Sequence, residues 1–296
     1  MYYRRKIILS LLALKKESIA KIDLQKLLFI FTKYQDSTKV YEFVPYKFGC
    51  FSFQANADLK TMIKYDLVSA DEKKWTLEDT TTNYFDQLKE GDKKTLLALM
   101  KHHGQKSTSD LIKFTYKSFP YWATKSTVAE KYLSKEELAK VETHKTPSSH
   151  KALFTIGYEG IPLEAYLNKL IKNDIRVLLD VRKNAKSMKY GFSKNQLSNA
   201  CNGIGVEYMH MPEVGIESDK RTELKDQSDY DSLFKEYKKT TLTTTVSYQE
   251  QIKELVAKYD RVALTCFEEN ICQCHRKPLA ESVVSLSKTK LELNHI

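Results

Sequence analysis

Long hydrophobic runs are missing from this chain of 296 residues. No stretch of about 18 apolar residues is present, which is the length that a membrane-crossing helix requires. The apolar stretch at residues 7–14 is shorter, lacks a small-residue cleavage site and leads into Lys15 and Lys16. We therefore interpret it as a core helix rather than a signal peptide, and we expect no membrane partner.

Several common catalytic motifs are also missing. The sequence contains no phosphate-binding loop with its glycines and lysine, no zinc-protease helix motif and no dinucleotide fingerprint. Their absence argues against common nucleotide hydrolysis and hydride transfer, and we expect no cofactor.

Cysteine is scarce, with five residues in the whole chain. The count is odd, and the chain is long enough to form a hydrophobic core without disulfide bonds. Cys272 and Cys274 are too close in sequence for an ordinary structural disulfide. These features predict reduced thiols and a cytoplasmic location.

The composition is that of a folded protein with a basic surface. Hydrophobic residues make up 42% of the chain and charged residues 29%, and the formal net charge is +10. The length favours two domains of about 150 residues each. The positive charge, mostly from lysine, suits nucleic acid or a phosphorylated small molecule as a partner, although lysine can also serve solubility alone.

A domain boundary is predicted in the polar stretch at residues 139–151, which has no apolar period. It divides the chain into residues 1–145 and 150–296. In the first part, apolar residues recur at helical spacing around residues 7–14 and 24–31, and further helices are expected at residues 57–63 and 93–100. Short strands at residues 67–69 and 75–77 lie between the last two of these helices. We therefore predict a mainly helical, winged-helix-like domain.

The second part alternates between strands and helices. Strands are expected at residues 153–157, 177–181, 206–209 and 261–266, with helices at residues 163–172, 194–201, 248–258 and from Pro278 onward. This order predicts an α/β domain with a parallel sheet covered on both faces. In such sheets, ligands bind beyond the carboxyl ends of the strands.

Three of these strand ends deliver polar residues that could share one rim of the sheet, namely Tyr158 and Glu159, Asp180 and Arg182, and Cys266 and Glu268. A carboxylate beside a guanidinium has two interpretations. Either Arg182 binds an anionic substrate while Asp180 orients it or moves a proton, or the two form a partly buried ion pair that closes the sheet.

The segment from Cys266 to Arg276 is the most informative in the chain. Pro278 suits a first helical turn, which places Cys274, His275 and Arg276 just ahead of a helix N-terminus. Backbone N–H groups and the helix dipole favour anions there, and the same field is expected to lower the pKa of Cys274. The segment therefore predicts an anion site or a nucleophilic thiolate.

Two other features remain open. Three cysteines and His275 in this segment invite a zinc interpretation, but adjacent Cys274 and His275 cannot easily both bind one tetrahedral ion, so no metal is assigned. A rhodanese or tyrosine-phosphatase loop is not present, because Cys272 stands six residues after Cys266 where arginine is required. A loop at residues 210–221, which ends in Arg221, could close the site or serve as a solvated connector.

The second half resembles the domain of unknown function 488 family. Four motifs in order carry the resemblance: Thr155–Gly160, the Asp-Val-Arg at residues 180–182, residues 211–216, and Cys266-Phe-Glu with Cys274-His-Arg. The departures are Cys272 and the valine at position 214 where leucine is usual. The resemblance implies a compact α/β fold with a shared polar site and a prokaryotic protein encoded near mobile or defence genes.

The first half more loosely resembles the Panacea antitoxin-like helical domain, through residues 24–29 and the Tyr-Lys-Phe-Gly loop at residues 46–49. Basic helical faces at residues 21–33 and 60–64 could contact DNA, and the domain could instead bind a protein partner. A solvated charged surface explains the same spacing.

Two functions fit these features. The first is a nucleic-acid- or nucleotide-processing enzyme, such as a hydrolase or glycosylase, with catalytic candidates Asp180, Arg182, Cys266, Glu268 and Cys274. Its substrate-binding candidates are Tyr158, Glu159, Arg221, His275 and Arg276. The second is a non-catalytic sensor or regulator that binds DNA or a nucleotide in the same pocket.

Overall fold

Residues 1–36, 38–217, 219, 224–287 and 290–296 are described by the computed structural model. The chain divides into two units, Met1–Lys145 and Thr146–Ile296. None of the described helices is both long enough and apolar enough to cross a membrane.

The first unit is mainly helical, as the sequence predicts. Its core packs around three helices, α1 (Tyr3–Lys15), α2 (Lys21–Tyr34) and α3 (Phe53–Ile63). A small antiparallel sheet has the order β1-β5-β4, formed by Ile19–Ala20, Lys74–Leu77 and Val68–Ala70. A separate hairpin, β2 (Val44–Tyr46) and β3 (Gly49–Phe51), precedes α3. The apolar residues that predicted the first two helices are buried because they face this core.

Further helices complete the first unit: α4 (Glu90–His103), α5 (Thr108–Ser118), α6 (Ala129–Tyr132) and α7 (Lys135–Glu142), with a 3-10 turn at Pro120–Ala123. Ser107 accepts a hydrogen bond from the backbone N–H of Asp110, which identifies Ser107 as the N-cap of α5. Side-chain oxygens at this position stabilise a helix by satisfying a backbone donor at its N-terminus.

The second unit contains a parallel sheet of five strands in the order β10-β6-β9-β7-β8. The strands are β6 (Ala152–Gly157), β7 (Val177–Asp180), β8 (Glu207–His210), β9 (Arg261–Cys266) and β10 (Glu292–His295). All four neighbouring pairs run parallel, so the predicted α/β class is confirmed. Strand β10 was not predicted, because its sequence alternates without a fully apolar run.

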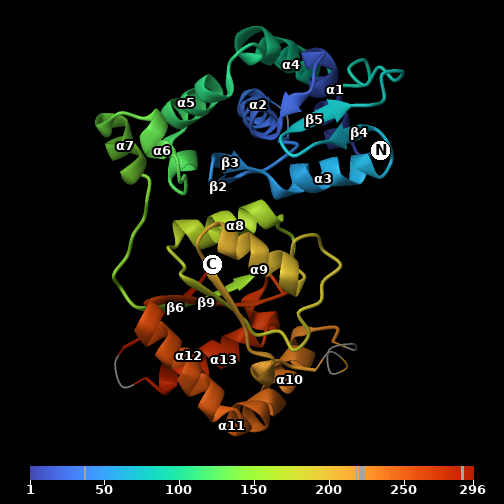
Figure 1. The fold of residues 1–296 in the computed structure, drawn as a ribbon. Helices are drawn as coiled ribbons and strands as arrows, with labels where there is room; N and C mark the ends of the chain where they lie inside the picture. Colours follow the sequence, from blue (N-terminus) through green and yellow to red (C-terminus); the bar gives the residue numbers. More distant parts are fainter. Residues whose placement is uncertain (37, 218, 220–223, 288–289) are drawn as a thin grey trace. The chain divides into compact units, whose positions relative to one another are not determined.

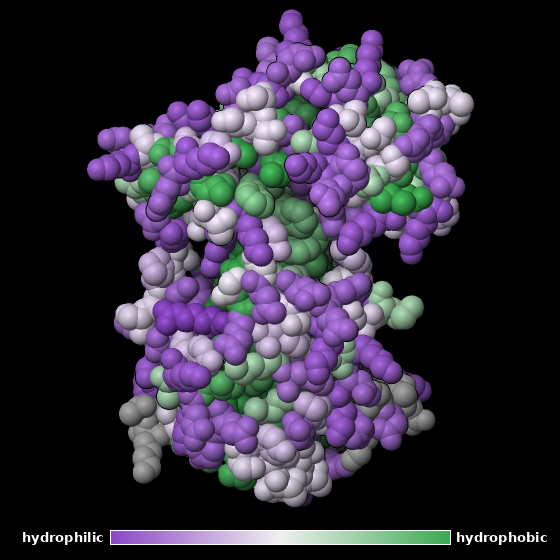
Figure 2. Space-filling model, in the orientation of Figure 1, coloured by the Kyte–Doolittle hydropathy of each residue, from purple (hydrophilic) through white to green (hydrophobic). Residues whose placement is uncertain are grey.

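Helices lie on both faces of this sheet (Figure 1). On one side are α8 (Leu163–Lys172) and α9 (Lys194–Gly203), and on the other are α12 (Val246–Tyr259) and α13 (Arg276–Ser285). Two further helices, α10 (Gln227–Lys239) and α11 (Thr241–Thr244), precede α12. The predicted bounds of α8 and β9 match the structure residue for residue. On the face shown in Figure 2, hydrophilic residues cover most of the surface of each unit.

Candidate functional site

The register of the sheet brings the ends of three strands together. Gly157, the last residue of β6, pairs with Cys266 of β9, and Asp180 of β7 pairs with Thr265 of β9. Beyond these ends lies a pocket of about 240 Å³. Its lining is formed by Tyr158, Arg182, Lys183, Asn184, Lys186, Ser187, Ile216, Cys266, Phe267 and His275. The pocket occupies the edge of the sheet where ligands bind in open α/β folds.

Asp180 and Arg182 form a buried ion pair at the end of β7. The carboxylate of Asp180 accepts two bonds from the Arg182 side chain, at 2.8 Å from Nε and 2.5 Å from Nη2. It also accepts the hydroxyl of Tyr208 at 2.7 Å. Asp180 is fully buried and Arg182 is 5% exposed. Burial alone would lower the pKa of Arg182, but the hydrogen bonds and charge of Asp180 raise it above its ordinary value, so Arg182 stays charged.

The remaining donors of Arg182 hold the wall of the pocket. Its Nη1 donates to the hydroxyl of Tyr158 at 2.7 Å and to the carbonyl of Phe192 at 3.0 Å. The Tyr158 and Phe192 rings are stacked, with centroids 4.3 Å apart. The two side chains therefore form a buried ion pair at the end of β7, and the binding of a substrate by Arg182 stays a prediction.

Cys266 and His275 face each other at the floor of the pocket. The Sγ atom of Cys266 lies 3.6 Å from Nδ1 of His275 and 3.2 Å from a carboxylate oxygen of Glu268. The Nε2 atom of His275 lies 3.0 Å from the carbonyl oxygen of Val181. A carbonyl can only accept, so Nε2 carries a proton, and in the neutral ring Nδ1 is the acceptor nitrogen that faces the thiol. This arrangement gives one thiol two nearby proton acceptors.

Cys274 lies behind this pair and does not line the pocket. The Sγ atoms of Cys266 and Cys274 and a ring nitrogen of His275 all lie within 4.8 Å of one another. Burial, together with the neighbouring Cys266, raises the pKa of the Cys274 thiol well above its ordinary value. The expected lowering by the helix dipole was wrong, because Cys274 is fully desolvated and not exposed at the helix N-terminus.

Arg276 supports the loop that carries Glu268, and its predicted binding of substrate stays a prediction. Helix α13 begins at Arg276, with His275 as its N-cap, two residues earlier than the sequence predicted. The Arg276 guanidinium donates to the backbone carbonyls of Glu268 at 2.5 Å and Glu269 at 3.1 Å. Gly157 allows this approach, since a Cβ atom there would lie 1.9 Å from the Glu268 carbonyl oxygen.

Two further residues of the predicted site, Glu159 and His210, do not line the pocket. Glu159 is exposed, and its carboxylate accepts the backbone N–H of Glu269 at 3.0 Å, which joins the loops after β6 and β9. Arg221 lies outside the described residues. His210 ends β8 and donates from Nε2 to the carbonyl of Arg182 at 2.9 Å.

Sequence reasoning missed six pocket residues: four in the loop after β7, one after β8 and one after β9. These are Lys183, Asn184, Lys186, Ser187, Ile216 and Phe267. Lys183 is half-buried and pairs with Glu217 at 2.8 Å, Lys186 is exposed, and Phe267 is 42% exposed. The available signal was the polar run that directly follows a predicted strand end, the position at which parallel sheets bind ligands.

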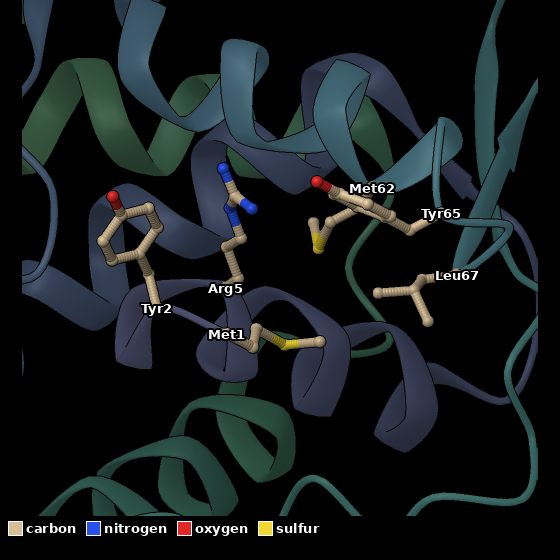
Figure 3. A pocket seen from close by; sticks show the side chains of 6 residues that line it. All are labelled: Met1, Tyr2, Arg5, Met62, Tyr65 and Leu67. Carbon is tan, nitrogen blue, oxygen red and sulfur yellow. The ribbon is translucent and has the colours of Figure 1, made fainter.

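A second hollow, of about 590 Å³, lies in the first unit (Figure 3). Met1, Tyr2 and Arg5 line it from the start of the chain, and Met62, Tyr65 and Leu67 line it from the end of α3 and the turn after it. Arg5 donates to Asp58 at 2.8 Å. Since Arg5 is the only charged side chain of the lining and already has an anionic partner, the pocket of the second unit is the better candidate for chemistry.

The second unit also matches a known family. A family model described as Domain of unknown function DUF488 matches residues 162–283. The match contains the ion pair and the whole Cys266–Arg276 segment, whereas the motif at residues 155–160 precedes it. The predicted resemblance of the second half is thereby confirmed. No curated protein matches the chain. The resemblance of the first half to an antitoxin-like domain stays a prediction.

Proposed function

We propose that this chain, which carries a DUF488 domain in its second half, is a nucleotide- or nucleic-acid-processing enzyme. The observation that supports this is a single pocket at the strand ends. It combines two lysines, an exposed aromatic ring and a buried thiol beside an imidazole. The substrate is an anion with a planar base, and the reaction takes place at Cys266 and His275.

Lys183 and Lys186 are assigned to phosphate binding. Both line the pocket, and the net charge of +10 attracts anionic ligands to the protein. The ammonium group of Lys183 is paired with the carboxylate of Glu217. A bound phosphate would compete with this carboxylate for Lys183. The volume of about 240 Å³ is below the range of about 300–1,000 Å³ for sites that enclose a whole ligand. The pocket therefore accepts part of a nucleotide, either a mononucleotide that remains partly outside it or the reacting end of a longer chain.

Phe267 is assigned to the base. Its ring is 42% exposed at the pocket and meets the buried Tyr158 ring edge-on, with centroids 5.3 Å apart. Bases stack on such rings whatever their sequence, and an aromatic face beside basic side chains is typical of single-stranded nucleic-acid sites. This arrangement supports a nucleotide over a simple phosphorylated metabolite.

The chemistry is assigned to the Cys266 and His275 end of the pocket. Asp180 and Arg182 bind each other and two tyrosine hydroxyls, so we assign them a positioning role rather than a catalytic one. Glu268, whose carboxylate lies 3.2 Å from the Cys266 thiol, is placed to accept a proton. Hydrolytic attack on a glycosidic or phosphate bond is the reaction class that these groups fit.

The test is product formation by the full-length chain. Nucleotides and short single- and double-stranded oligonucleotides are incubated with the protein, and the products are identified by mass spectrometry. We expect turnover that Cys266→Ser abolishes. The matched control is Cys272→Ser, because Cys272 is exposed and does not line this pocket. Binding without turnover in the wild type would favour a sensor or regulator, and absence of both would contradict the proposal.

The first unit is proposed to recruit nucleic acid. Its order α1, β1, α2, β2, β3, α3, β4, β5 is that of a winged helix with the β2–β3 hairpin inserted between the second and third helices. In three-helix modules of this kind the third helix contacts DNA. Lys60, on α3, and Lys64, directly after it, are exposed. Lys60→Glu together with Lys64→Glu should weaken duplex binding and reduce its salt dependence. Unchanged duplex binding would leave a protein partner as the role of this unit.

A further inference from the structure

We propose that Cys266, Cys274 and His275 bind one zinc ion at the floor of the pocket. The site would have three protein ligands and one open position. Whether zinc occupies the site does not depend on the proposed function. The part of the zinc ion in the reaction rests on that function.

The distances fit a tetrahedral ion. The Sγ atom of Cys266 and Nδ1 of His275 are 3.6 Å apart, and all three ligand atoms lie within 4.8 Å of one another. Zinc bonds of about 2.3 Å to sulfur and about 2.0–2.1 Å to nitrogen, at the tetrahedral angle, separate those two atoms by about 3.6 Å. The separation of Cys266 and His275 therefore matches a shared zinc ion, and Cys274 lies close enough to supply the second sulfur.

The surroundings of His275 support this role. The proton on Nε2 is held by the Val181 carbonyl at 3.0 Å, so Nδ1, which lies 3.6 Å from the Sγ atom of Cys266, is the nitrogen that would bind the ion. Histidines that bind metals commonly donate their other N–H to a backbone carbonyl or carboxylate in this way, which fixes the ring orientation. His275 is 1% exposed, so few alternative ring positions are available.

The backbone conformation allows the neighbouring residues Cys274 and His275 to bind the same ion. Cys274 has an extended conformation with φ −127° and ψ 135°, and His275 is helical with φ −64° and ψ −17°. This change of direction turns both side chains toward Cys266. Cys272, the other cysteine of the segment, is exposed and is not a ligand.

The fourth position opens toward the substrate. Cys266 and His275 line the pocket whereas Cys274 does not, so we place the open coordination position on the side of the pocket. Three protein ligands with one exchangeable position are the pattern of catalytic rather than structural zinc. Glu268, whose carboxylate lies 3.2 Å from the Sγ atom of Cys266, would accept a proton from a water bound at that position. Sulfur and imidazole donors select zinc over magnesium or calcium, which prefer oxygen.

The test is the metal content of full-length protein purified without chelators and then incubated with zinc chloride and desalted. We expect close to one zinc per chain in the wild type and at least a tenfold loss in Cys274→Ser. This variant leaves every residue that lines the pocket in place. The matched control is Cys201→Ser, which removes a second fully buried cysteine in helix α9 and should retain zinc.

A second readout keeps the proposal testable if Cys274→Ser does not fold. In the wild type, cobalt(II) loaded in place of zinc should give the thiolate-to-metal charge-transfer absorption of a tetrahedral ion with two sulfur ligands, and added zinc should abolish that absorption. Zinc-free wild-type protein, or an intact mass lacking two hydrogens because the two thiols form a disulfide, would overturn the proposal. Zinc-free protein that still turns over nucleotides would refute the metal alone, and zinc-loaded protein that binds no nucleotide would refute the proposed function alone.

Discussion

His275 donates a hydrogen bond from Nε2 to the backbone carbonyl of Val181 at 3.0 Å. This bond joins residues 94 positions apart in the sequence and ties the N-terminus of helix α13 to the end of strand β7. It places the thiol and imidazole beside the loop that carries Lys183 and Lys186. The site therefore depends on the position of this loop relative to α13 as much as on the reactive side chains.

Asp180→Asn is expected to destabilise the second unit. The substitution removes one charge of a buried, hydrogen-bonded pair and leaves Arg182 uncompensated, which costs about 3–5 kcal/mol. Urea unfolding of the full-length protein measures the change. The control is Glu250→Gln, which breaks a partly exposed pair with Lys253 and should cost no more than about 1 kcal/mol.

The same variant separates the two interpretations of Asp180. If Asp180 moved a proton during catalysis, Asp180→Asn would unfold like the wild type and lose only turnover. That outcome would contradict the positioning role.

Gly157→Ala is expected to displace the loop after β9. The new Cβ would lie 1.9 Å from the carbonyl oxygen of Glu268 and 3.0 Å from Nη2 of Arg276. Either the loop moves or strand β6 distorts, so the free energy of unfolding of the second unit should fall by about 1–3 kcal/mol. Ligand binding in the pocket should weaken as well.

The control for this variant is Gly91→Ala, in helix α4, where nothing lies within 4 Å of the new Cβ. It should be neutral or stabilise the first unit by up to about 1 kcal/mol. Equal effects of the two substitutions would show that Gly157 does not hold the loop.

Acid is expected to destabilise the first unit through Asp58. Burial alone would raise the pKa of this carboxyl, but hydrogen bonds from Arg4 and Arg5 lower it below its ordinary value. A carboxyl whose pKa is lower in the folded state than in the unfolded state stabilises the fold at pH values above its unfolded pKa of about 4. Asp58 therefore loses this contribution as the pH falls through its folded pKa. Thermal unfolding between pH 7 and strongly acidic pH measures the loss.

Asp58→Asn should lower stability at neutral pH by about 1.5–3 kcal/mol, since it removes hydrogen bonds between charged groups. It should also flatten the decline in acid. If the variant and the wild type lost stability in parallel below about pH 4, another group would be responsible.

Much of the fold follows from local sequence. The bounds of α8 and β9 were predictable because one shows a clear helical period and the other is a short apolar run. The meeting of Asp180, Cys266 and His275 near one edge follows from the rule that parallel strands end together. These predictions need only periodicity and topology.

The roles of individual side chains depend on partners that are distant in sequence. The hydrogen bonds of Arg276 to the carbonyls of the loop in front of it were not predictable from the sequence, and its binding of substrate stays a prediction. Cys274 was expected to be an activated thiol, but its burial has the opposite effect on its pKa. Helix α10 was missed because charged residues and tyrosines interrupt its apolar face. Burial and pairing of this kind arise only when the tertiary structure forms.

Binding of a single-stranded oligonucleotide, measured over a range of salt concentrations, tests most directly whether a phosphate occupies the pocket at Lys183 and Lys186. The double variant Lys183→Gln, Lys186→Gln is compared with the wild type and with Lys169→Gln, an exposed lysine of α8 outside the pocket. We predict weaker binding by the double variant. The slope of the logarithm of the binding constant against the logarithm of the salt concentration should be less steep by about 0.7 for each lysine. Identical affinity and slope in the double variant and the wild type would contradict phosphate binding at this site.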